Sequence, residues 1–256
     1  ANFDCAVSFR VVIPARMQST RLPGKVLLDL AGKPLLQHVV ERARESAAAE
    51  VWIATDNDTV MARAQDWPAR VQLTREDHHS GSDRILEVAD AQGWDDDDVI
   101  VNLQGDEPLL PAPLIDAVAQ GLSDGADWAT LATPIHNASE YFDPNAVKVV
   151  CNRAGDAMYF SRAPIPWDRA QGPQRALPQG MQALRHIGLY AYRTSALRRY
   201  CAAAQADVER CESLEQLRAL SLGMRIAVTV CEEPPPAGVD TPEDLERVRQ
   251  VLDAEG

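Results

Sequence analysis

The feature that most constrains the fold of this chain is an alternation of short β-branched runs with stretches of helical periodicity. The run FRVVIPA at residues 9–15 predicts a strand, and the apolar residues of the next stretch, 34–46, recur on one helical face. Pro34 stands where proline is favoured, at the opening of that helix. Because a β-run returns after each helical stretch, the sequence predicts βαβ units and an α/β fold with a mainly parallel sheet.

The same alternation continues along most of the chain. Further strands are predicted from residue 99 onward and at residues 51–55, 71–74, 128–135, 186–193 and 225–233, and helices at residues 56–65, 114–122 and 241–254. Helical segments are also expected around residues 195–204 and 213–223, and a strand, a turn at Gly155 and a second ordered segment within residues 147–167. Residues 168–182 are rich in Gly, Pro and Gln without periodicity, which predicts a mobile loop.

Two of the predicted helices begin with side chains suited to capping. Asp56 or Asn57 is expected to cap the helix of residues 56–65. At the C-terminal helix, Thr241 is the expected cap and Pro242 takes the first position. Asp244 stands where the partner of a capping box is placed.

Length and charge bound the class of protein. The 256 residues can bury the core of one large α/β domain, and no long linker divides the sequence. A formal net charge of −13 argues against a surface for nucleic acid or anionic membranes, since polyanions bind an extended positive field. The five cysteines are scattered and odd in number, which indicates reduced thiols. Because neither a leader pattern nor a membrane-spanning apolar run is visible, a cytoplasmic protein is expected.

A cluster of positive charge follows the first predicted strand, within VVIPARMQSTRLPGKVL. Arg16, Arg21 and Lys25 lie in a Gly-containing turn between a strand and a helix, a common arrangement for holding phosphates. The turn has neither the Walker A spacing nor G-x-G-x-x-G. From the spacing alone, a solvated basic loop is the alternative interpretation.

Two carboxylate motifs complement this basic turn. Asp106, in NLQGDEP, follows a buried strand at the carboxyl edge of the sheet, where ligands of open α/β sheets bind. A carboxylate facing a phosphate-binding turn is placed to hold Mg²⁺, although an Asp-Glu turn that caps a helix explains the same residues equally well. Asp240, in GVDTPED, also has a simple alternative role, because an acidic residue stabilises a helix N-terminus.

Nine stretches of the chain, in order from about residue 9 to residue 252, closely resemble one enzyme family. They are IPARMQSTRLPGK, IATD, TREDHHSGSDRI, VNLQGDEP, DPNAVKVV, YFSRAPIPWDR, RHIGLYAYR, ESLEQLRAL and GVDTPEDLERVR. The first stretch alone indicates only a broader nucleotidyltransferase fold. The ordered set is similar to the 3-deoxy-manno-octulosonate cytidylyltransferases, also called CMP-Kdo synthetases.

This resemblance implies that CTP and Kdo (3-deoxy-D-manno-octulosonate) react to give CMP-Kdo and pyrophosphate, a step in lipopolysaccharide biosynthesis. It also implies a Mg²⁺-dependent cytoplasmic homodimer with a three-layer α/β/α sandwich of nucleotide-diphospho-sugar transferase type, built on a mostly parallel, Rossmann-like sheet. One nucleotidyltransferase domain is expected over residues 9–252. Within it, residues 9–135 would mainly bind CTP, residues 136–225 would serve the sugar and the dimer, and residues 226–252 would carry the second metal carboxylate.

The resemblance also implies roles for individual residues of the nucleotide site. The nucleotide would contact Ala15, Arg16, Arg21, Lys25, Arg75, Ser80, Gly81, Gln104 and Asp106. Arg16 and Lys25 would act in catalysis, with Lys25 opposing the charge that develops on the leaving pyrophosphate. Asp106 and Asp240 would hold Mg²⁺ and complete the catalytic set.

On the sugar side, the resemblance implies contacts from Gln104, Arg162, His186, Tyr190, Glu215 and Gln216. Judged by residue type alone, the last five have ordinary structural explanations, such as a surface ion pair or an exposed helix face. The neighbouring pair His78 and His79 lacks an i,i+4 partner and makes a poor zinc site.

Departures from the family pattern lie in predicted loops. AQDWPARVQ is short and DRAQGPQRALPQG has its own composition, which affects loop closure and dimer contacts more than chemistry. An amino-substituted Kdo (8-amino-Kdo) or sialic acid is an alternative substrate that would preserve the nucleotide site. A methylerythritol-phosphate cytidylyltransferase is disfavoured by the RHIGLYAYR and ESLEQLRAL stretches. A non-catalytic nucleotide-binding module on the same fold is the alternative from another class.

Overall fold

A computed structural model describes residues 7–17, 22–170 and 176–255 of the chain. Within these residues the main sheet has nine strands, in the order β11-β7-β10-β6-β1-β4-β5, with β8 and β9 added beside β10. The strands are β1 (Phe9–Ala15), β4 (Glu50–Thr55), β5 (Arg70–Leu73), β6 (Val99–Asn102), β7 (Trp128–Pro134), β8 (Lys148–Cys151), β9 (Ala157–Ser161), β10 (Leu184–Arg193) and β11 (Ile226–Val230). A separate two-stranded sheet consists of β2 (Asp29–Leu30) and β3 (Lys33–Pro34).

Parallel pairing dominates the central part of the sheet. β1 lies parallel to both β4 and β6, β4 to β5, and β7 to β11. β10 is the exception, because it runs antiparallel between β6 and β7. The predicted mostly parallel α/β fold is confirmed, with antiparallel pairing at β10 and at the added strands β8 and β9 that periodicity does not reveal.

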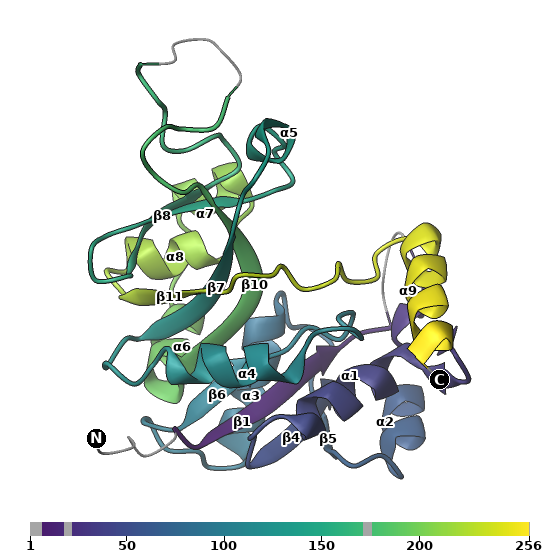
Figure 1. The fold of residues 1–256 in the computed structure, drawn as a ribbon. Coiled ribbons are helices and arrows are strands. Elements are labelled where there is room, and N and C mark those ends of the chain that lie inside the picture. The colour runs from purple at the N-terminus through teal and green to yellow at the C-terminus, as the bar shows by residue number, and fades with distance from the viewer. Residues whose placement is uncertain (1–6, 18–21, 171–175, 256) are drawn as a thin grey trace, which may run out of the picture.

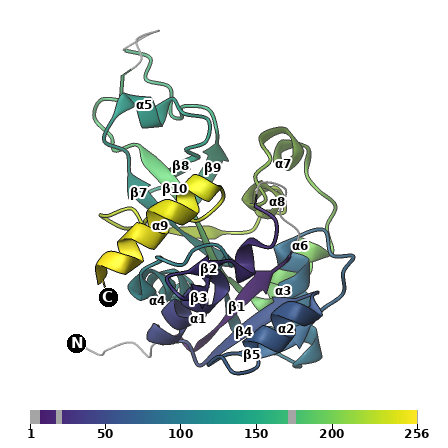
Figure 2. The same cartoon turned by 90° about the vertical axis from the view of Figure 1, so that its right-hand side faces the viewer.

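Helices cover both faces of the sheet (Figure 2). They are α1 (Leu35–Glu45), α2 (Asp58–Ala64), α3 (Gly81–Ala91), α4 (Ala112–Gln120), α5 (Ala138–Tyr141), α6 (Thr194–Cys201), α7 (Asp207–Glu212), α8 (Gln216–Ser221) and α9 (Pro242–Glu255). Successive side chains of β1 alternate between two cores: Val11 and Ile13 pack with α1 and α4, and Val12 packs with α3 and α6. The sheet and the helices packed on each of its two faces together form the three-layer α/β/α sandwich.

Local capping explains where three of these helices begin. Asn57 Oδ1 accepts hydrogen bonds from two N–H groups of the first turn of α2, so Asn57 is the cap. Thr241 and Asp244 exchange the two bonds of a capping box at α9, as predicted. α3 is absent from the predicted elements, although its own capping box between Ser80 and Asp83 is visible as an S-x-x-D spacing.

Two further features place segments around the sheet edge. β8 and β9 extend the sheet beside β10, with α5 at the same end of the molecule (Figure 2). The turn between β8 and β9 uses Gly155 with φ of 87°, as predicted. After β11 the chain crosses to α9, which lies near α1 (Figure 1). Residues 171–175 of the predicted mobile loop lie outside the described residues. None of the helices in the described part of the chain is long and apolar enough to span a membrane.

Candidate active site

A lysine bridges two carboxylates that come from distant parts of the sequence. Gly24, in a left-handed conformation with φ of 68°, turns the chain into the short 3₁₀ helix η1 (Lys25–Leu27). The ammonium of Lys25 donates to Asp106 Oδ2 at 2.6 Å and to Asp240 Oδ1 at 3.0 Å. Because Asp106 follows β6 and Asp240 precedes α9, three segments meet at one positive charge.

The electrostatics of this cluster keep the lysine charged. Burial lowers the pKa of Lys25, but the charges of Asp106 and Asp240 and their hydrogen bonds outweigh burial and raise the pKa above its ordinary value. Next to them, burial and the charges of the same two carboxylates raise the pKa of Glu107 to about 8, against an opposing effect of Lys25. The cluster therefore contains a charged lysine, and Glu107 is mostly protonated at neutral pH.

The segment that carries Asp240 is fastened to the end of β6 by its backbone. The Val239 N–H donates to the Asp106 carbonyl at 2.8 Å. A Cβ atom at Gly238 would lie 2.9 Å from both the Asp106 carbonyl oxygen and Glu107 Oε1. Glycine alone avoids this contact, so Gly238 permits the approach that brings Asp240 to Lys25.

An irregularity in β10 shapes a second group of polar side chains. The register between β10 and β7 shifts between Ile187 and Tyr190, a bulge of the kind often found beside active sites. The buried Thr130 of β7 lies 3.1 Å from the Ile187 carbonyl and 2.9 Å from the Leu189 carbonyl, and so holds the bulge. His186 and Tyr190 flank it with ring centroids 5.5 Å apart.

These rings face a cavity of about 960 Å³ beside the sheet edge. Five of the six residues predicted to contact the sugar line it, namely Gln104, His186, Tyr190, Glu215 and Gln216. The Tyr190 hydroxyl donates to Gln216 Oε1 at 3.1 Å. The Gln216 amide nitrogen is buried and has no hydrogen-bond partner among the described residues. The cavity is therefore polar, and it contains an unused donor.

His186 is held in its neutral form. Burial lowers the pKa of His186 to about 3. Its Nε2 lies 2.9 Å from the Thr130 hydroxyl, whose single proton has two carbonyl oxygens within reach. We assign the imidazole proton to Nε2, which donates to Thr130 and leaves Nδ1 as an acceptor.

Glu215 connects this cavity to the basic turn. Burial raises the pKa of Glu215 above its ordinary value, while the charges of Arg218 and Arg16 oppose the shift. Arg218 is itself held by two hydrogen bonds to the buried Glu209, at 2.6 and 2.8 Å. Arg16 is exposed just after β1, so its positive charge reaches the cavity from the side of the basic turn.

Ala15 and Arg21 are two other residues of the predicted nucleotide site. Ala15 is buried as the last residue of β1, where it packs into the core. Arg21 lies outside the described residues.

Three further residues of the predicted nucleotide site, Arg75, Ser80 and Gly81, lie at or shortly before the start of α3. Arg75 is exposed, with its Nε 3.4 Å from Asp77 and 3.7 Å from Glu87. It lines a cavity of about 710 Å³ along α3 together with His78, but neither Ser80 nor Gly81 is among the described lining residues.

Ser80 and Gly81 also stabilise the start of α3. The Ser80 hydroxyl donates to Asp83 Oδ2 at 2.8 Å and accepts from the Asp83 N–H at 3.1 Å, which caps the helix. A Cβ atom at Gly81 would lie 3.3 Å from a side-chain carbon of Pro14. The missing side chain therefore lets α3 begin close to the end of β1.

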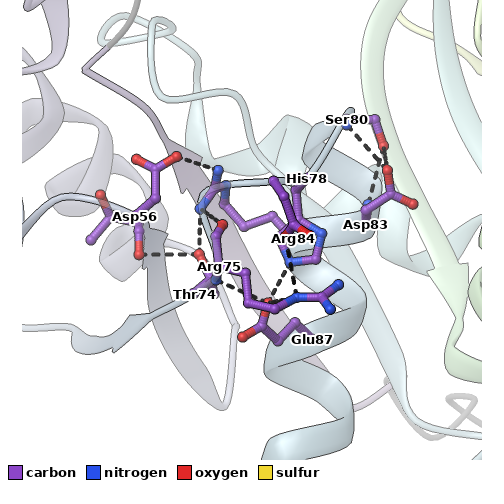
Figure 3. Close-up of polar contacts among 10 residues, drawn as sticks. Asp56, Thr74, Arg75, His78, Ser80, Asp83, Arg84 and Glu87 are labelled. Carbon is purple, nitrogen blue, oxygen red and sulfur yellow. Dashed lines mark hydrogen bonds and ion pairs between the residues drawn. The ribbon is translucent and has the colours of Figure 1, made fainter.

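A buried arginine that the sequence did not single out organises the loop carrying Arg75. Arg84 of α3 is fully buried and pairs with Asp56, which follows β4 (Figure 3). The guanidinium also donates to the Thr74 hydroxyl and, at 3.3 Å, to the Arg75 carbonyl (Figure 3). Asp56 is thus an ion-pair partner and not a helix cap. The sequence feature that could have indicated a buried ion pair is the position of Arg84 among the apolar residues of 81–91.

Arg162 lies next to the cavity that the other predicted sugar residues line, where backbone carbonyls hold its guanidinium. Its Nε donates to the Glu212 carbonyl at 2.7 Å, and its terminal nitrogens reach the carbonyls of Pro144 at 3.1 Å and Ser213 at 3.4 Å. It is not among the described lining residues of that cavity. The physical reason is that the end of α7 leaves carbonyls without helical partners, and the guanidinium satisfies them.

Two residues at the site carried no predicted role. Glu107 lies inside the NLQGDEP motif but was not assigned, because its protonation depends on burial that a sequence does not display. Arg185 lines the cavity of about 960 Å³, with its Nε 3.1 Å from Glu140 Oε1. Its position beside His186 in RHIGLYAYR was the available signal.

Comparison with known proteins places this geometry among nucleotidyltransferases. Residues 10–226 match the family described as cytidylyltransferase. A solved structure of CMP:2-keto-3-deoxy-manno-octonic acid synthetase complexed with CTP is similar, with 42% sequence identity and a TM-score of 0.88 over 97% of this chain and 100% of that chain. A cytidylyltransferase from Leptospira borgpetersenii serovar Hardjo-bovis (strain JB197) shares the fold at 18% identity and a TM-score of 0.62, over 97% and 87% of the two chains.

Proposed function

The chain belongs to the cytidylyltransferase family, and from that premise we propose that it transfers the cytidylyl group of CTP to Kdo, forming CMP-Kdo and pyrophosphate. The observation that carries the proposal is the 42% identity to a synthetase named for that product, matched over its full length. The site geometry supports it, because Gln104 precedes the Asp106 carboxylate by two residues and also lines the polar cavity. Gln104 thus lies between the carboxylate proposed to act at the phosphates and the cavity proposed to bind the sugar.

Residues of the basic turn are proposed to hold the triphosphate. Arg16 and Lys25, with Arg21 beyond the described residues, supply the positive charge that the three phosphates require. The raised pKa of Lys25 keeps its ammonium charged through the physiological range. Lys25 is therefore suited to oppose the charge that develops on the leaving pyrophosphate.

Magnesium fits the carboxylates of this site. Asp106 and Asp240 present oxygens to the same small region, and Mg²⁺ binds one or two carboxylates together with phosphate oxygens and water. No group of three or more His, Cys, Asp or Glu side chains in the described parts of the chain is arranged for a metal, so the nucleotide would complete the coordination. When bound, the ion would neutralise phosphate charge and increase the acidity of the attacking hydroxyl.

The protein contributes alignment and charge neutralisation to the proposed reaction. The anomeric 2-hydroxyl oxygen of Kdo would form a bond to the α-phosphorus while the bond from that phosphorus to the bridging oxygen breaks. Pyrophosphate would leave with the bridging oxygen, and the hydroxyl proton would pass to water. His186, as a neutral acceptor, and Gln216, as a buried donor, would orient sugar hydroxyls in the cavity. A carboxyl oxygen of Glu215 would accept a hydrogen bond from a further sugar hydroxyl in the same cavity.

Assembly and location belong to the same proposal. Met158, Trp167 and Met181 expose 64%, 60% and 48% of their surface within residues 136–225, which supports a homodimer formed through that region. Synthesis of CMP-Kdo would place the enzyme in the cytoplasm as a supplier of activated sugar acid for lipopolysaccharide.

Two other functions are tested by the same assay. Transfer to 8-amino-Kdo or to sialic acid would keep the nucleotide chemistry and change only the contacts in the cavity. A non-catalytic nucleotide-binding module would bind CTP without turnover, and the intact set of Lys25, Asp106 and Asp240 argues against it.

The deciding experiment is Mg²⁺-dependent pyrophosphate release from CTP with Kdo, 8-amino-Kdo, N-acetylneuraminate or no sugar. We expect release with Kdo, and we expect Asp106→Asn to lower it strongly while Asp97→Asn, at a side chain 95% exposed, leaves it unchanged. Release with another acid alone would replace Kdo as the substrate. CTP binding without release from any acid would establish the non-catalytic alternative.

A further inference from the structure

We infer that Arg185, and not Arg162, binds the carboxylate of the sugar acid, an inference that rests on the proposed function. Arg185 is the only lysine or arginine among the described residues lining the cavity of about 960 Å³. The same lining contains the carboxyl groups of Glu140, Asp143 and Glu215. An anion would be repelled by these groups unless a cation faced it, and Arg185 is the cation among the described lining residues.

The position of Arg185 matches the chemistry of the substrate. In a 2-ulosonic acid the carboxylate and the reacting hydroxyl are attached to the same anomeric carbon. The carboxylate must therefore lie close to the α-phosphate of CTP. Arg185 also lines a second cavity, of about 240 Å³. The lining of this cavity includes Glu107, which follows Asp106, and Gly238, which lies in the segment before Asp240. Arg185 therefore stands where the two cavities meet.

The guanidinium of Arg185 contains a donor, the buried Nε–H, that has no hydrogen-bond partner among the described residues. Its Nε lies 3.1 Å from Glu140 Oε1, within ion-pair distance, but the N–H does not point at that oxygen. A substrate carboxylate could accept two parallel hydrogen bonds from such a guanidinium, which discriminates a carboxylate from a neutral group.

Arg162 lacks this freedom. Its guanidinium is engaged by the carbonyls of Pro144, Glu212 and Ser213, and its backbone N–H donates to Glu212 Oε2 at 2.9 Å. These contacts join β9 to the end of α7, which precedes the helix carrying Gln216. Arg162 is thus a positioning residue for the cavity wall.

The test compares Kdo with its C1 carboxamide in the pyrophosphate-release assay, using the wild-type protein, Arg185→Gln, Arg185→Lys and Arg162→Gln. For Arg185→Gln we expect the KM for Kdo to rise about 10- to 100-fold, the loss of one charge-assisted interaction, while the KM for CTP stays within about twofold. The preference for the acid over the amide should collapse in this variant. Arg185→Lys should retain part of that preference, because it keeps the charge but loses the bidentate geometry.

Arg162→Gln should lower thermal stability and activity toward both sugars in proportion, which leaves the acid preference intact. The inference is overturned if Arg185→Gln keeps the wild-type preference for the acid, or if Arg162→Gln is the variant that loses it. These results differ from failure of the proposed function, in which wild-type protein releases no pyrophosphate with any acid. If wild-type protein uses N-acetylneuraminate, the same comparison is made with that acid and its amide, since its carboxylate is also on the anomeric carbon.

Discussion

Lys25 Nζ lies 2.6 Å from Asp106 Oδ2, so the basic turn and the carboxyl end of β6 form one ion pair across 81 positions of sequence. The same ammonium also pairs with Asp240 at 3.0 Å. Lysine and carboxylates thus neutralise one another at the place where the proposed reaction brings phosphates and a metal. Substrate binding would exchange these partners, with Lys25 moving to phosphate and the carboxylates to Mg²⁺.

Replacing Lys25 by Met should lower the rate of pyrophosphate release by about 10²- to 10³-fold, the typical cost of losing one charged or hydrogen-bonding group that stabilises a transition state. Steady-state kinetics with CTP and Kdo would measure the loss in kcat. Lys33→Met is the matched control, because Lys33 pairs with Glu41 at an exposed position away from the site. A Lys25→Met enzyme with near-normal kcat would remove Lys25 from the proposed mechanism.

Replacing Arg84 by Met should lower the free energy of unfolding by about 3–5 kcal/mol, because Asp56 would remain largely buried without its partner. The loop carrying Arg75 would also lose its anchor, so the KM for CTP should rise more than kcat falls. Urea unfolding and CTP kinetics measure the two effects. Arg199→Met, which breaks an ion pair with Asp127 between two partly exposed side chains, should cost less than about 1 kcal/mol. An equal loss in both variants would contradict the special role of Arg84.

The neutral His186 predicts a loss of stability in acid. Burial lowers its folded-state pKa to about 3 from an ordinary value of 6.5, so between these values the unfolded chain binds a proton that the folded chain excludes. The contribution of His186 to the free energy of unfolding should therefore fall as the pH decreases from 6.5 toward 3. Urea unfolding at pH 7 and pH 4.5 measures this slope.

His186→Asn should make that slope shallower, whereas His79→Asn, at an exposed position, should leave it unchanged. The same slope in wild type and His186→Asn would show that the half-buried imidazole does not cause the loss.

Replacing Gly238 by Ala should damage both stability and catalysis. Its Cβ would fall 2.9 Å from the Asp106 carbonyl oxygen, so the segment before Asp240 must shift, at a cost of about 1–3 kcal/mol. Thermal unfolding would measure the cost, and pyrophosphate release should fall because Asp240 moves with the segment. Gly188→Ala is the control for stability, since no atom lies within 4 Å of the added carbon. Unchanged melting and turnover in Gly238→Ala would show that the segment has room to adapt.

Features of the fold that depend on residues close together in the sequence could be predicted. Alternating β-branched and helical periods predicted the α/β class and the mostly parallel sheet, because those periods report which side chains can be buried together. The bonds of Thr241 with Asp244 and the turn at Gly155 were predictable for the same reason, since they join residues a few positions apart. The family resemblance likewise brought Lys25, Asp106 and Asp240 together before any geometry was known.

Local sequence patterns predicted the fold class and the cap of the C-terminal helix, and the family resemblance supplied the residues of the candidate site. Tertiary packing set the antiparallel insertion of β10, the burial of Arg84 against Asp56, and the use of Arg162 by backbone carbonyls while Arg185 lines the cavity. A charged side chain can face a ligand only where packing does not place unpaired backbone groups beside it, as it does beside Arg162. Those groups come from segments far apart in the chain, and local periodicity carries no information about how such segments pair.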